Sequence, residues 1–269
     1  MMTVAVLICV YGGDNLLHFK ECIDSIKSES LSGELNINIY LHVDGPISHD
    51  MSDYIKSQEF FIVIRSEIGV GLAAGLNKLI QNLGEEEFVF RMDADDVVVP
   101  GRFNSQLNYM QNHPNVDISG GSIAEFLRGI DNIVNVRSYP LVDEDIKSTL
   151  FRASPLAHMT VCFRKGYFDR FGLYPTSYPF NEDLAYWIQS SQQNVVFGNI
   201  NNVLVNVRMD GAYDRRRTLK AWPEFKLYSY HNIRHFKLPI IPFMRYIFRY
   251  FPKHLVKVIY NSSIRKLFT

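Results

Sequence analysis

Cysteine and long hydrophobic runs are scarce in this chain of 269 residues. Its three cysteines, Cys9, Cys22 and Cys162, show no CxxC spacing, so the sequence predicts neither a disulfide framework nor a zinc site. No apolar run approaches the roughly 18 residues that a membrane-spanning helix needs. The opening segment MMTVAVLICVYGG lacks a basic start, so we expect a first β-strand there rather than a signal peptide. We therefore expect a protein that is kept on the cytosolic side.

Repeats and low-complexity tracts are also absent, which excludes a largely disordered chain. No GxxxxGK followed by Ser or Thr occurs, which excludes a P-loop kinase. Hydrophobic residues make up 47% of the sequence and charged residues 21%, as is ordinary for a globular protein. The length suits one α/β domain, or one domain with an appendage.

The formal net charge is zero, but the two signs are unevenly distributed. Residues 1–212 carry 15 Lys and Arg against 26 Asp and Glu, whereas residues 213–269 carry 13 against 2. Such an asymmetry predicts that the basic segment meets an anionic surface, which can be membrane lipid, a phosphate-bearing substrate or nucleic acid. We place the one domain boundary near residue 213.

Short β-branched runs alternate with helical patterns through the first half of the chain. The predicted strands are 3–10, 37–43, 60–65 and 87–92, and the predicted helices lie near 16–29, 50–57 and 71–82. This alternation predicts an α/β fold with a Rossmann-like, mostly parallel central sheet flanked by helices. Ligands of such sheets bind beyond the carboxyl ends of the strands.

The second half is less regular. The predicted helices lie near 101–112 and 182–192, and the predicted strands are 116–119, 133–137, 158–164, 195–198 and 203–208. We expect these elements to extend the sheet and to cover the site.

The segment RMDADD, residues 91–96, follows a predicted buried strand and precedes a turn into a helix. Side chains two apart in an extended segment project to the same face, so Asp93 and Asp95 can address one ligand together. Paired carboxylates suit Mg²⁺ or Mn²⁺, which takes its remaining oxygens from waters and substrate phosphates. The alternative is that the aspartates only cap a helix and solvate a loop.

RMDADD followed by PGRF resembles the DxD segment of family 2 glycosyltransferases, which have the GT-A fold. The resemblance covers residues 3 to about 210 and is carried by several ordered motifs. It implies an enzyme that transfers a sugar from a nucleoside diphosphate donor, with Mn²⁺ or Mg²⁺ held by Asp95 and Asp93. Arg91, in the same segment, is expected on the nucleotide-sugar side.

The resemblance also implies nucleotide contacts after the earlier strands. Val10 and Tyr11 match the family's xVYN-like segment, although this chain reads VYGGD. Asp44 in LHVDGP matches an Asp that contacts the base, and the alternative is an ordinary Asp-Gly-Pro turn. Asn77 in GVGLAAGLN matches an Asn near the nucleotide, although small residues at a helix start also serve close helix–sheet packing.

The segment PFNEDLAYWI, residues 179–188, matches the family's acidic pair at a helix start. An inverting sugar transfer needs one carboxylate to take the proton from the attacking hydroxyl. The resemblance assigns that base to Asp183, with Glu182 nearer the acceptor. The alternative is that both acids only complement the helix dipole.

Two further residues are candidates by their place in the motif order. His158 is expected near the acceptor side, or else is an ordinary core histidine. Arg208 falls where the family often has a residue that contacts the diphosphate, and a guanidinium there would offset phosphate charge. The alternative is a solvated surface arginine.

Residues 236–268 mix bulky apolar residues with cations that recur every four residues. The four cations are Arg245, Arg249, Lys253 and Lys257. Prolines divide the segment, so we expect short helical pieces. The pattern predicts an interfacial segment whose cations meet anionic headgroups. The alternative is a helical lid packed on the catalytic domain.

Taken with the resemblance, these patterns predict a GT-A domain at 1–212 and a basic aromatic helical extension at 213–269. Within the domain, 1–99 is expected to bind the nucleotide sugar and 100–212 the acceptor. The expected reaction is an inverting transfer of a hexose or N-acetylhexosamine, from a UDP-sugar by family frequency, to a polyprenyl-diphosphate-linked glycan. Such enzymes assemble surface polysaccharide, namely O-antigen of lipopolysaccharide, capsule or exopolysaccharide.

We expect a cytoplasmic protein that is peripheral on the inner face of the cytoplasmic membrane, with no nucleic-acid partner. The alternative function is a non-catalytic nucleotide-sugar-binding or membrane-scaffolding protein on the same fold. A sugar nucleotidyltransferase is disfavoured because VYGGDN lacks the basic residue that its phosphate loop needs.

Overall fold

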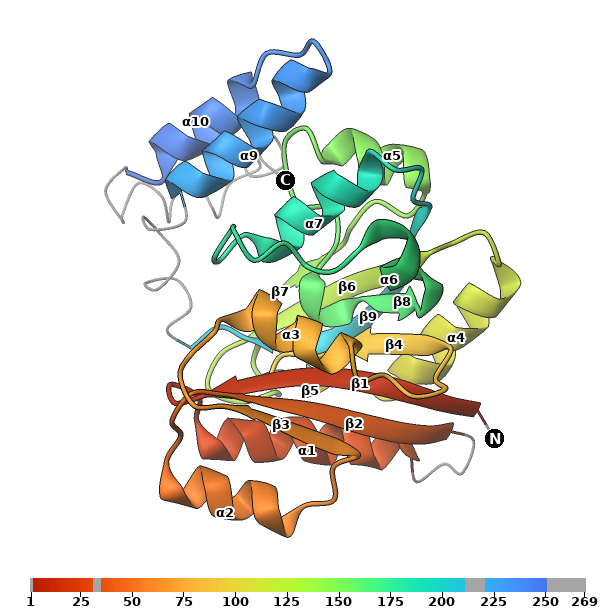
Figure 1. The fold of residues 1–269 in the computed structure, drawn as a ribbon. Coiled ribbons are helices and arrows are strands. Elements are labelled where there is room, and N and C mark those ends of the chain that lie inside the picture. The colour runs from red at the N-terminus through yellow and green to blue at the C-terminus, as the bar shows by residue number, and fades with distance from the viewer. Residues whose placement is uncertain (1, 31–34, 211–220, 251–269) are drawn as a thin grey trace.

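The computed structural model describes residues 2–30, 35–210 and 221–250, and one nine-stranded sheet organises them (Figure 1). The strands are β1 Met2–Tyr11, β2 Leu35–Asp44, β3 Ile62–Ser66, β4 Phe88–Arg91, β5 Val97–Val98, β6 Ile118–Phe126, β7 Ile133–Arg137, β8 Cys162–Arg164 and β9 Phe197–Arg208. The helices are α1 Leu16–Ser30, α2 His49–Ser57, α3 Leu72–Ile80, α4 Arg102–Asn112, α5 Asp143–Thr149, α6 Gly166–Phe171, α7 Glu182–Ser191, α9 Ala221–Arg234 and α10 Ile240–Phe248, with a 3₁₀ turn at His158–Thr160.

The strand order is β3-β2-β1-β4-β8-β6-β9-β5, with β7 paired to β6. The first four strands in this order are parallel neighbours. Strand β1 pairs in the parallel sense with both β2 and β4, and β2 pairs in the same sense with β3. The second half is mixed: β8 runs antiparallel to β4 and β6, whereas β6 and β9 are parallel. The predicted α/β fold, with a largely parallel sheet and flanking helices, is confirmed.

Strand β1 shows how the sequence sets the two layers of the core. Val4, Val6 and Ile8 pack in one apolar cluster with residues of α1, while Ala5 and Leu7 pack in a second cluster with residues of α3 and α7. Successive side chains of a strand point to opposite faces, so a continuous apolar run is what a strand covered on both faces requires. Figure 1 shows α1 and α2 below the sheet and α3 and α7 above it.

The predicted boundaries fail mostly in the second half. The strand predicted at 158–164 is a 3₁₀ turn followed by the short β8, and the two strands predicted at 195–198 and 203–208 are one strand, β9. Register shifts in the β6–β9 pairing interrupt this strand's alternation, which explains why the pattern reads as two pieces. The short α5, α6 and β5 carry too few residues to show a period.

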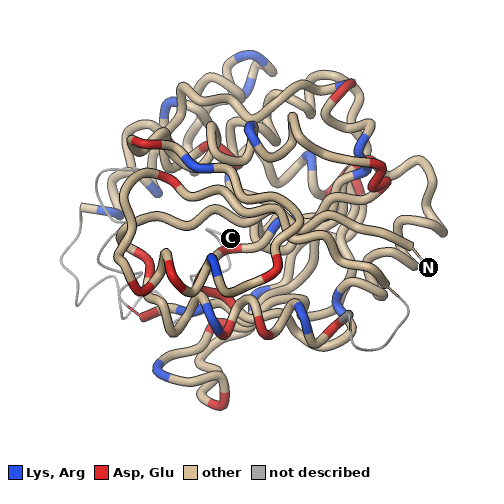
Figure 2. The backbone as a smooth tube through the Cα atoms, turned by 60° about the horizontal axis from the view of Figure 1, so that its bottom comes forward, with Lys and Arg blue, Asp and Glu red and all other residues tan. Residues whose placement is uncertain are grey.

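The basic extension is helical where it is described, as α9 and α10. Lys253 and Lys257 lie outside the described residues. Among the helices in the described ranges, none has both the length and the apolar character needed to cross a bilayer. All three cysteines are free. Figure 2 shows acidic and basic positions intermingled over the body of the protein.

Gly75 lets α3 approach the sheet closely. A Cβ at this position would overlap Nδ1 of His42 and lie 3.1 Å from Sγ of Cys9, on strands β2 and β1. Gly75 therefore serves close helix–sheet packing, which is the alternative that the sequence leaves open for the segment GVGLAAGLN.

We predict that Gly75→Ala lowers the free energy of unfolding by about 1–3 kcal/mol, because the added methyl group overpacks this contact. Urea denaturation measures the change. The matched control is Gly166→Ala at the first residue of α6, where a Cβ would meet nothing within 4 Å and no loss is expected. Equal losses in the two variants would contradict the packing argument.

Candidate functional site

The candidate residues gather where parallel strands end. Tyr11 at the end of β1 lies in register with Asp44 at the end of β2, and Arg91 at the end of β4 lies in register with Leu7 of β1. Because the three strands are parallel neighbours, the segments that follow them lie along one edge of the sheet. The sequence motifs VYGGD, VDGP and DADD therefore come together there.

A tight turn follows β1. The backbone N–H of Asp14 donates to the Tyr11 carbonyl at 3.1 Å, and the Asp14 carboxylate accepts from the Tyr11 N–H at 2.9 Å. The Tyr11 ring folds over Gly13, where a Cβ would overlap it, and is 48% exposed. Val10 is buried in the core, so its side chain is not available to a ligand, and its predicted nucleotide contact stays a prediction. Tyr11 is thus the side chain that this turn presents.

Asp44 fastens the loop that precedes α3. Its two carboxylate oxygens accept from the backbone N–H groups of Val70 and Gly71 at 2.7 and 3.0 Å. Gly71 has φ of 85°, a conformation that glycine adopts at little cost. The predicted contact of Asp44 with a base stays a prediction, and the structure adds that this carboxylate shapes the loop.

Asn77 joins α3 to the segment before α7. Its side-chain amide donates to the carbonyl of Tyr174 at 2.9 Å, and its amide oxygen accepts from the N–H of Tyr174 at 2.9 Å. The side chain is thus held by two bonds within the protein. Its predicted nucleotide contact remains untested.

A buried ion pair lies at the start of the DADD segment. Arg91 is 3% exposed, and its guanidinium bonds the carboxylate of Asp93. Burial lowers the pKa of Arg91, but the attraction of Asp93 outweighs it and the pKa is raised overall. Nε and Nη1 of Arg91 have no hydrogen-bond partner within the described part of the chain.

The three aspartates take different environments. Asp93 and Asp95 are half-buried, whereas Ala94 and Asp96 between and after them are buried, the alternation of an extended segment. Asp96 accepts from the backbone N–H of Arg208 at 2.9 Å. Burial, with the charges of Asp93 and Asp95, raises the pKa of Asp96 well above its usual range. Asp96 therefore has a structural role, whereas the carboxylates of Asp93 and Asp95 remain partly exposed.

Arg208 clamps this segment from the end of β9. Its Nε donates to the carbonyl of Asp95 at 3.1 Å, and its guanidinium pairs with Glu21 of α1. The residue is 8% exposed, which rules out a solvated surface arginine. Its predicted contact with a diphosphate stays a prediction.

The acidic pair lies in the first turn of α7. Glu182 and Asp183 are half-buried, and the preceding Asn181 is buried without making a side-chain cap. Burial is the main cause that raises the pKa of Tyr174, Arg91 lowers it, and Asp183 and Glu182 raise it further. Tyr174 thus lies within the electrostatic reach of both Arg91 and the start of α7.

His158 is hydrogen-bonded to Tyr174. Its Nε2 lies 2.9 Å from the Tyr174 hydroxyl. Its ring also packs edge-on against the Trp187 ring, with the ring centroids 6.0 Å apart. Burial, aided by the positive charge of Arg91, lowers the pKa of His158 well below its usual range, so the imidazole is neutral at pH 7. Among the residues of this candidate site, Tyr174 is the one that the sequence patterns do not identify. Its segment, FGLYPTSYPF, has no period or motif that singles it out.

The donor set at the edge suits a hard cation. Asp93 and Asp95 offer carboxylate oxygens, which are the ligands that Mg²⁺ and Mn²⁺ prefer. Within residues 2–30, 35–210 and 221–250, no cluster of three or more His, Cys, Asp or Glu side chains could hold a metal ion. A cation here would therefore complete its shell with water and substrate oxygens, as Mg²⁺ commonly does.

Comparison of whole sequences gives relatives of similar length. An uncharacterized glycosyltransferase of Haemophilus influenzae is 29% identical, over 98% of this chain and 100% of the relative. The amylovoran biosynthesis glycosyltransferase AmsE of Erwinia amylovora is 29% identical, over 82% and 81%. The UDP-Gal:alpha-D-GlcNAc-diphosphoundecaprenol beta-1,3-galactosyltransferase of Escherichia coli is 27% identical, over 97% and 96%.

Comparison of folds agrees. The crystal structure of residues 1–349 of S. aureus TarS superposes with a TM-score of 0.54 over 97% of this chain and 75% of that one, at 13% identity, which shows a shared GT-A fold. The sequence profile described as Glycosyl transferase family 2 matches residues 5–172, a span from β1 to the end of α6. The protein is therefore a glycosyltransferase and belongs to glycosyl transferase family 2.

Proposed function

We propose that this enzyme is an inverting, metal-dependent transferase that moves a hexose or N-acetylhexosamine from a UDP-sugar to a hydroxyl of a polyprenyl-diphosphate-linked glycan. The observation that supports this most is that Arg91 pairs with Asp93 and that its charge also acts on His158 and Tyr174, two buried residues that are bonded to each other. Asp183 and Glu182 act on the same Tyr174, so the carboxylate suited to act as a base lies in the electrostatic surroundings of the arginine that holds the carboxylate suited to a metal.

The names of two relatives support the substrate class. The Escherichia coli relative is named for transfer from UDP-Gal to a GlcNAc-diphosphoundecaprenol, and the Erwinia amylovora relative for amylovoran biosynthesis. On this basis we propose a role in surface polysaccharide assembly.

The donor would lie along the edge of the sheet formed by β1, β2 and β4. Tyr11 presents an exposed ring there, and Asp44 holds the backbone of the loop at Val70 and Gly71 beside it. Asp93 and Asp95 would hold Mn²⁺ or Mg²⁺, which when bound neutralises charge on the departing diphosphate. Arg91 restrains the Asp93 carboxylate, so one of these two acids is fixed in place.

Asp183 would accept the proton of the acceptor hydroxyl while that oxygen attacks the anomeric carbon from the face opposite the diphosphate. Its place in the first turn of α7 favours the ionised carboxylate, which is the form that can accept a proton. Glu182 would contact the acceptor from the same turn. The neutral His158, bonded to Tyr174, would shape the acceptor side without adding charge.

We also propose that the enzyme works at the inner face of the cytoplasmic membrane, because a polyprenyl-linked acceptor is confined there. The test of the reaction is direct: the purified protein is incubated with UDP-, GDP- and dTDP-sugars, with Mn²⁺ or with EDTA, and nucleoside diphosphate release is measured. Release from a UDP-sugar only with metal supports the proposal. Undiminished release with EDTA would contradict the metal requirement.

Asp95→Asn should lower metal-dependent donor turnover by roughly 10²–10³-fold, because the amide is a poorer ligand and carries no charge. The melting temperature should stay close to that of the wild type, since Asp95 is half-buried at the edge. The control is Asp53→Asn, the same change on the exposed side of α2. Wild-type turnover by Asp95→Asn would overturn the metal assignment.

Asp183→Asn should reduce turnover by roughly 10²–10⁴-fold, because the amide cannot accept the proton. Stabilisation by UDP-sugar with Mn²⁺, measured as a thermal shift, should persist because the donor residues lie on other elements. Glu182→Gln is the neighbouring control, with a smaller expected loss. A loss of donor stabilisation together with turnover would place Asp183 on the donor side instead.

A further inference from the structure

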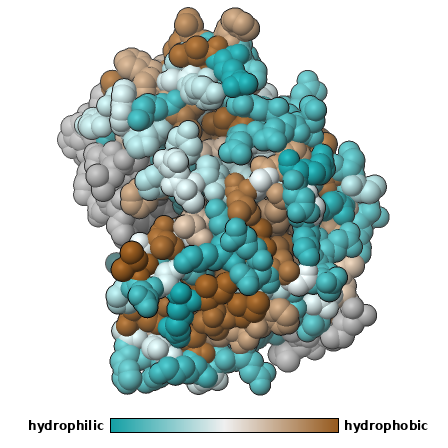
Figure 3. All heavy atoms as spheres, viewed as in Figure 1, coloured by the Kyte–Doolittle hydropathy of each residue, from teal (hydrophilic) through white to brown (hydrophobic). Residues whose placement is uncertain are grey.

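The turn between α9 and α10 exposes a cluster of large apolar side chains. This apolar tip consists of Ile233, Phe236, Leu238, Ile240 and Ile241. Phe236 is 100% exposed and Leu238 77% exposed. Figure 3 shows apolar residues gathered at the top of the molecule, where Figure 1 places the turn between these helices. Soluble surfaces rarely concentrate apolar groups in this way without a partner.

The backbone holds Phe236 outward in an unusual conformation. Its φ is 56°, at a position just after a helix where glycine is the usual residue. The N–H of Lys237 donates to the carbonyl of Asn232 at 2.9 Å and closes the turn. An aromatic residue here gains no packing within the described protein and adopts a left-handed conformation that bulky residues disfavour.

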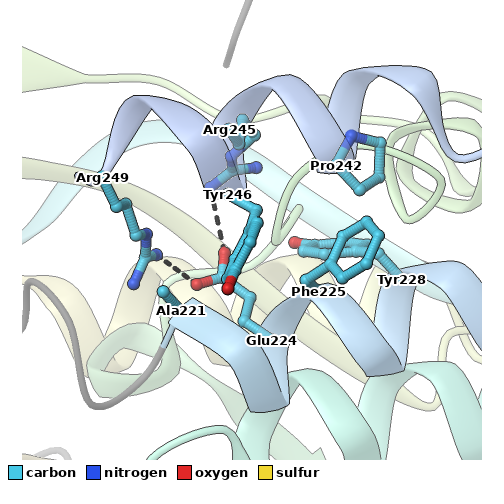
Figure 4. A pocket seen from close by; sticks show the side chains of 8 residues that line it. All are labelled: Ala221, Glu224, Phe225, Tyr228, Pro242, Arg245, Tyr246 and Arg249. Atoms are coloured by element: carbon cyan, nitrogen blue, oxygen red, sulfur yellow. Dashed lines mark hydrogen bonds and ion pairs between the residues drawn. The ribbon is translucent and has the colours of Figure 1, made fainter. Parts of the chain in front are cut away.

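The two helices are fastened to each other, so the tip is a fixed feature. Glu224 of α9 pairs with Arg245 at 3.2 Å and with Arg249, both on the α10 side (Figure 4). The rings of Phe225 and Tyr246 stack with their centroids 5.3 Å apart. These two arginines, predicted to meet lipid headgroups, are thus engaged between the helices.

The hairpin is also fastened to the body. The side-chain amide of Asn232 donates to the carbonyl of Phe151 at 2.9 Å, and the ring of His231 stacks on the Phe151 ring at 4.5 Å. Nζ of Lys237 lies 3.5 Å from the centroid of the same ring. The tip therefore projects at a set orientation relative to the catalytic domain.

The segment that forms the tip carries charge of one sign. No Asp or Glu follows Glu224 in the remaining sequence up to residue 269. Arg234, at the end of α9, lies beside the tip. A segment of apolar residues that is flanked in sequence by cations and contains no acid suits the boundary of an anionic bilayer, where the apolar groups enter and the cations meet phosphate.

We propose that the apolar tip inserts into the headgroup boundary of a bilayer containing anionic phospholipid and so orients the enzyme on the membrane. This inference rests on the proposed function, in which the acceptor is lipid-linked. Helix α9, which leads into the tip, packs beside α7, the helix whose first turn holds the proposed base. A second copy of the chain is a poorer occupant, since a stable interface uses about 20–30 residues a side.

The test is co-sedimentation of the full chain with vesicles of phosphatidylcholine alone or mixed equally with phosphatidylglycerol. The wild type should bind the mixed vesicles more strongly. The double variant Phe236→Gly with Leu238→Ser should bind them at least about tenfold more weakly, because anchoring scales with buried apolar area. Glycine suits the backbone at 236, so the fold should persist, as the melting temperature will show. The control is Leu17→Ser, an exposed leucine on α1.

Three outcomes would overturn the inference. The wild type binds neither kind of vesicle, or the double variant binds the mixed vesicles as strongly as the wild type does. In the third, the double variant loses only self-association or binding to a short DNA duplex. Donor turnover, measured in parallel without vesicles, tests the proposed function separately. Vesicle binding without turnover would refute the transferase mechanism alone, whereas turnover without vesicle binding would refute the tip alone.

Discussion

The ion pair between Arg91 and Asp93 is the constraint around which the site is built. A guanidinium that is 3% exposed loses its hydration and needs a carboxylate close by, since an unpaired buried charge is costly. The pair fixes the first acid of DADD. Burial lowers the pKa of His158, and the charge of Arg91 lowers it further; the same charge lowers the pKa of Tyr174, against the burial that raises it.

Much of the fold follows from local sequence. The apolar run of β1 predicts a strand covered on both faces, and the alternation of strands and helices predicts parallel pairing, because both depend on residues close together in the chain. The position of the acidic pair at the start of a helix was predicted for the same reason, and α7 begins at Glu182. These features need only periodicity and end signals.

The rest depends on contacts between distant segments. Arg208 lies 113 residues from the Asp95 carbonyl that it binds, and Asn77 lies 97 residues from Tyr174. No single-sequence pattern registers such pairs, so Arg208 was left open as a surface residue and Tyr174 was missed. The extension illustrates the same point. Its spacing leaves a packed lid and an interfacial segment as alternatives, whereas the structure shows Arg245 and Arg249 paired between the helices and the apolar tip exposed.

The bond between Asn77 and Tyr174 has a mechanical meaning. It ties α3, which follows the loop held by Asp44, to the segment that leads into α7. The sheet also runs without a break from β4 through β8 to β6, across the two halves of the domain. A hinge motion between those halves would have to break both the Asn77–Tyr174 hydrogen bonds and the strand pairing of β8. This frame opposes a jaw-like opening of two lobes and leaves rearrangement of loops and side chains as the motion available to the proposed site.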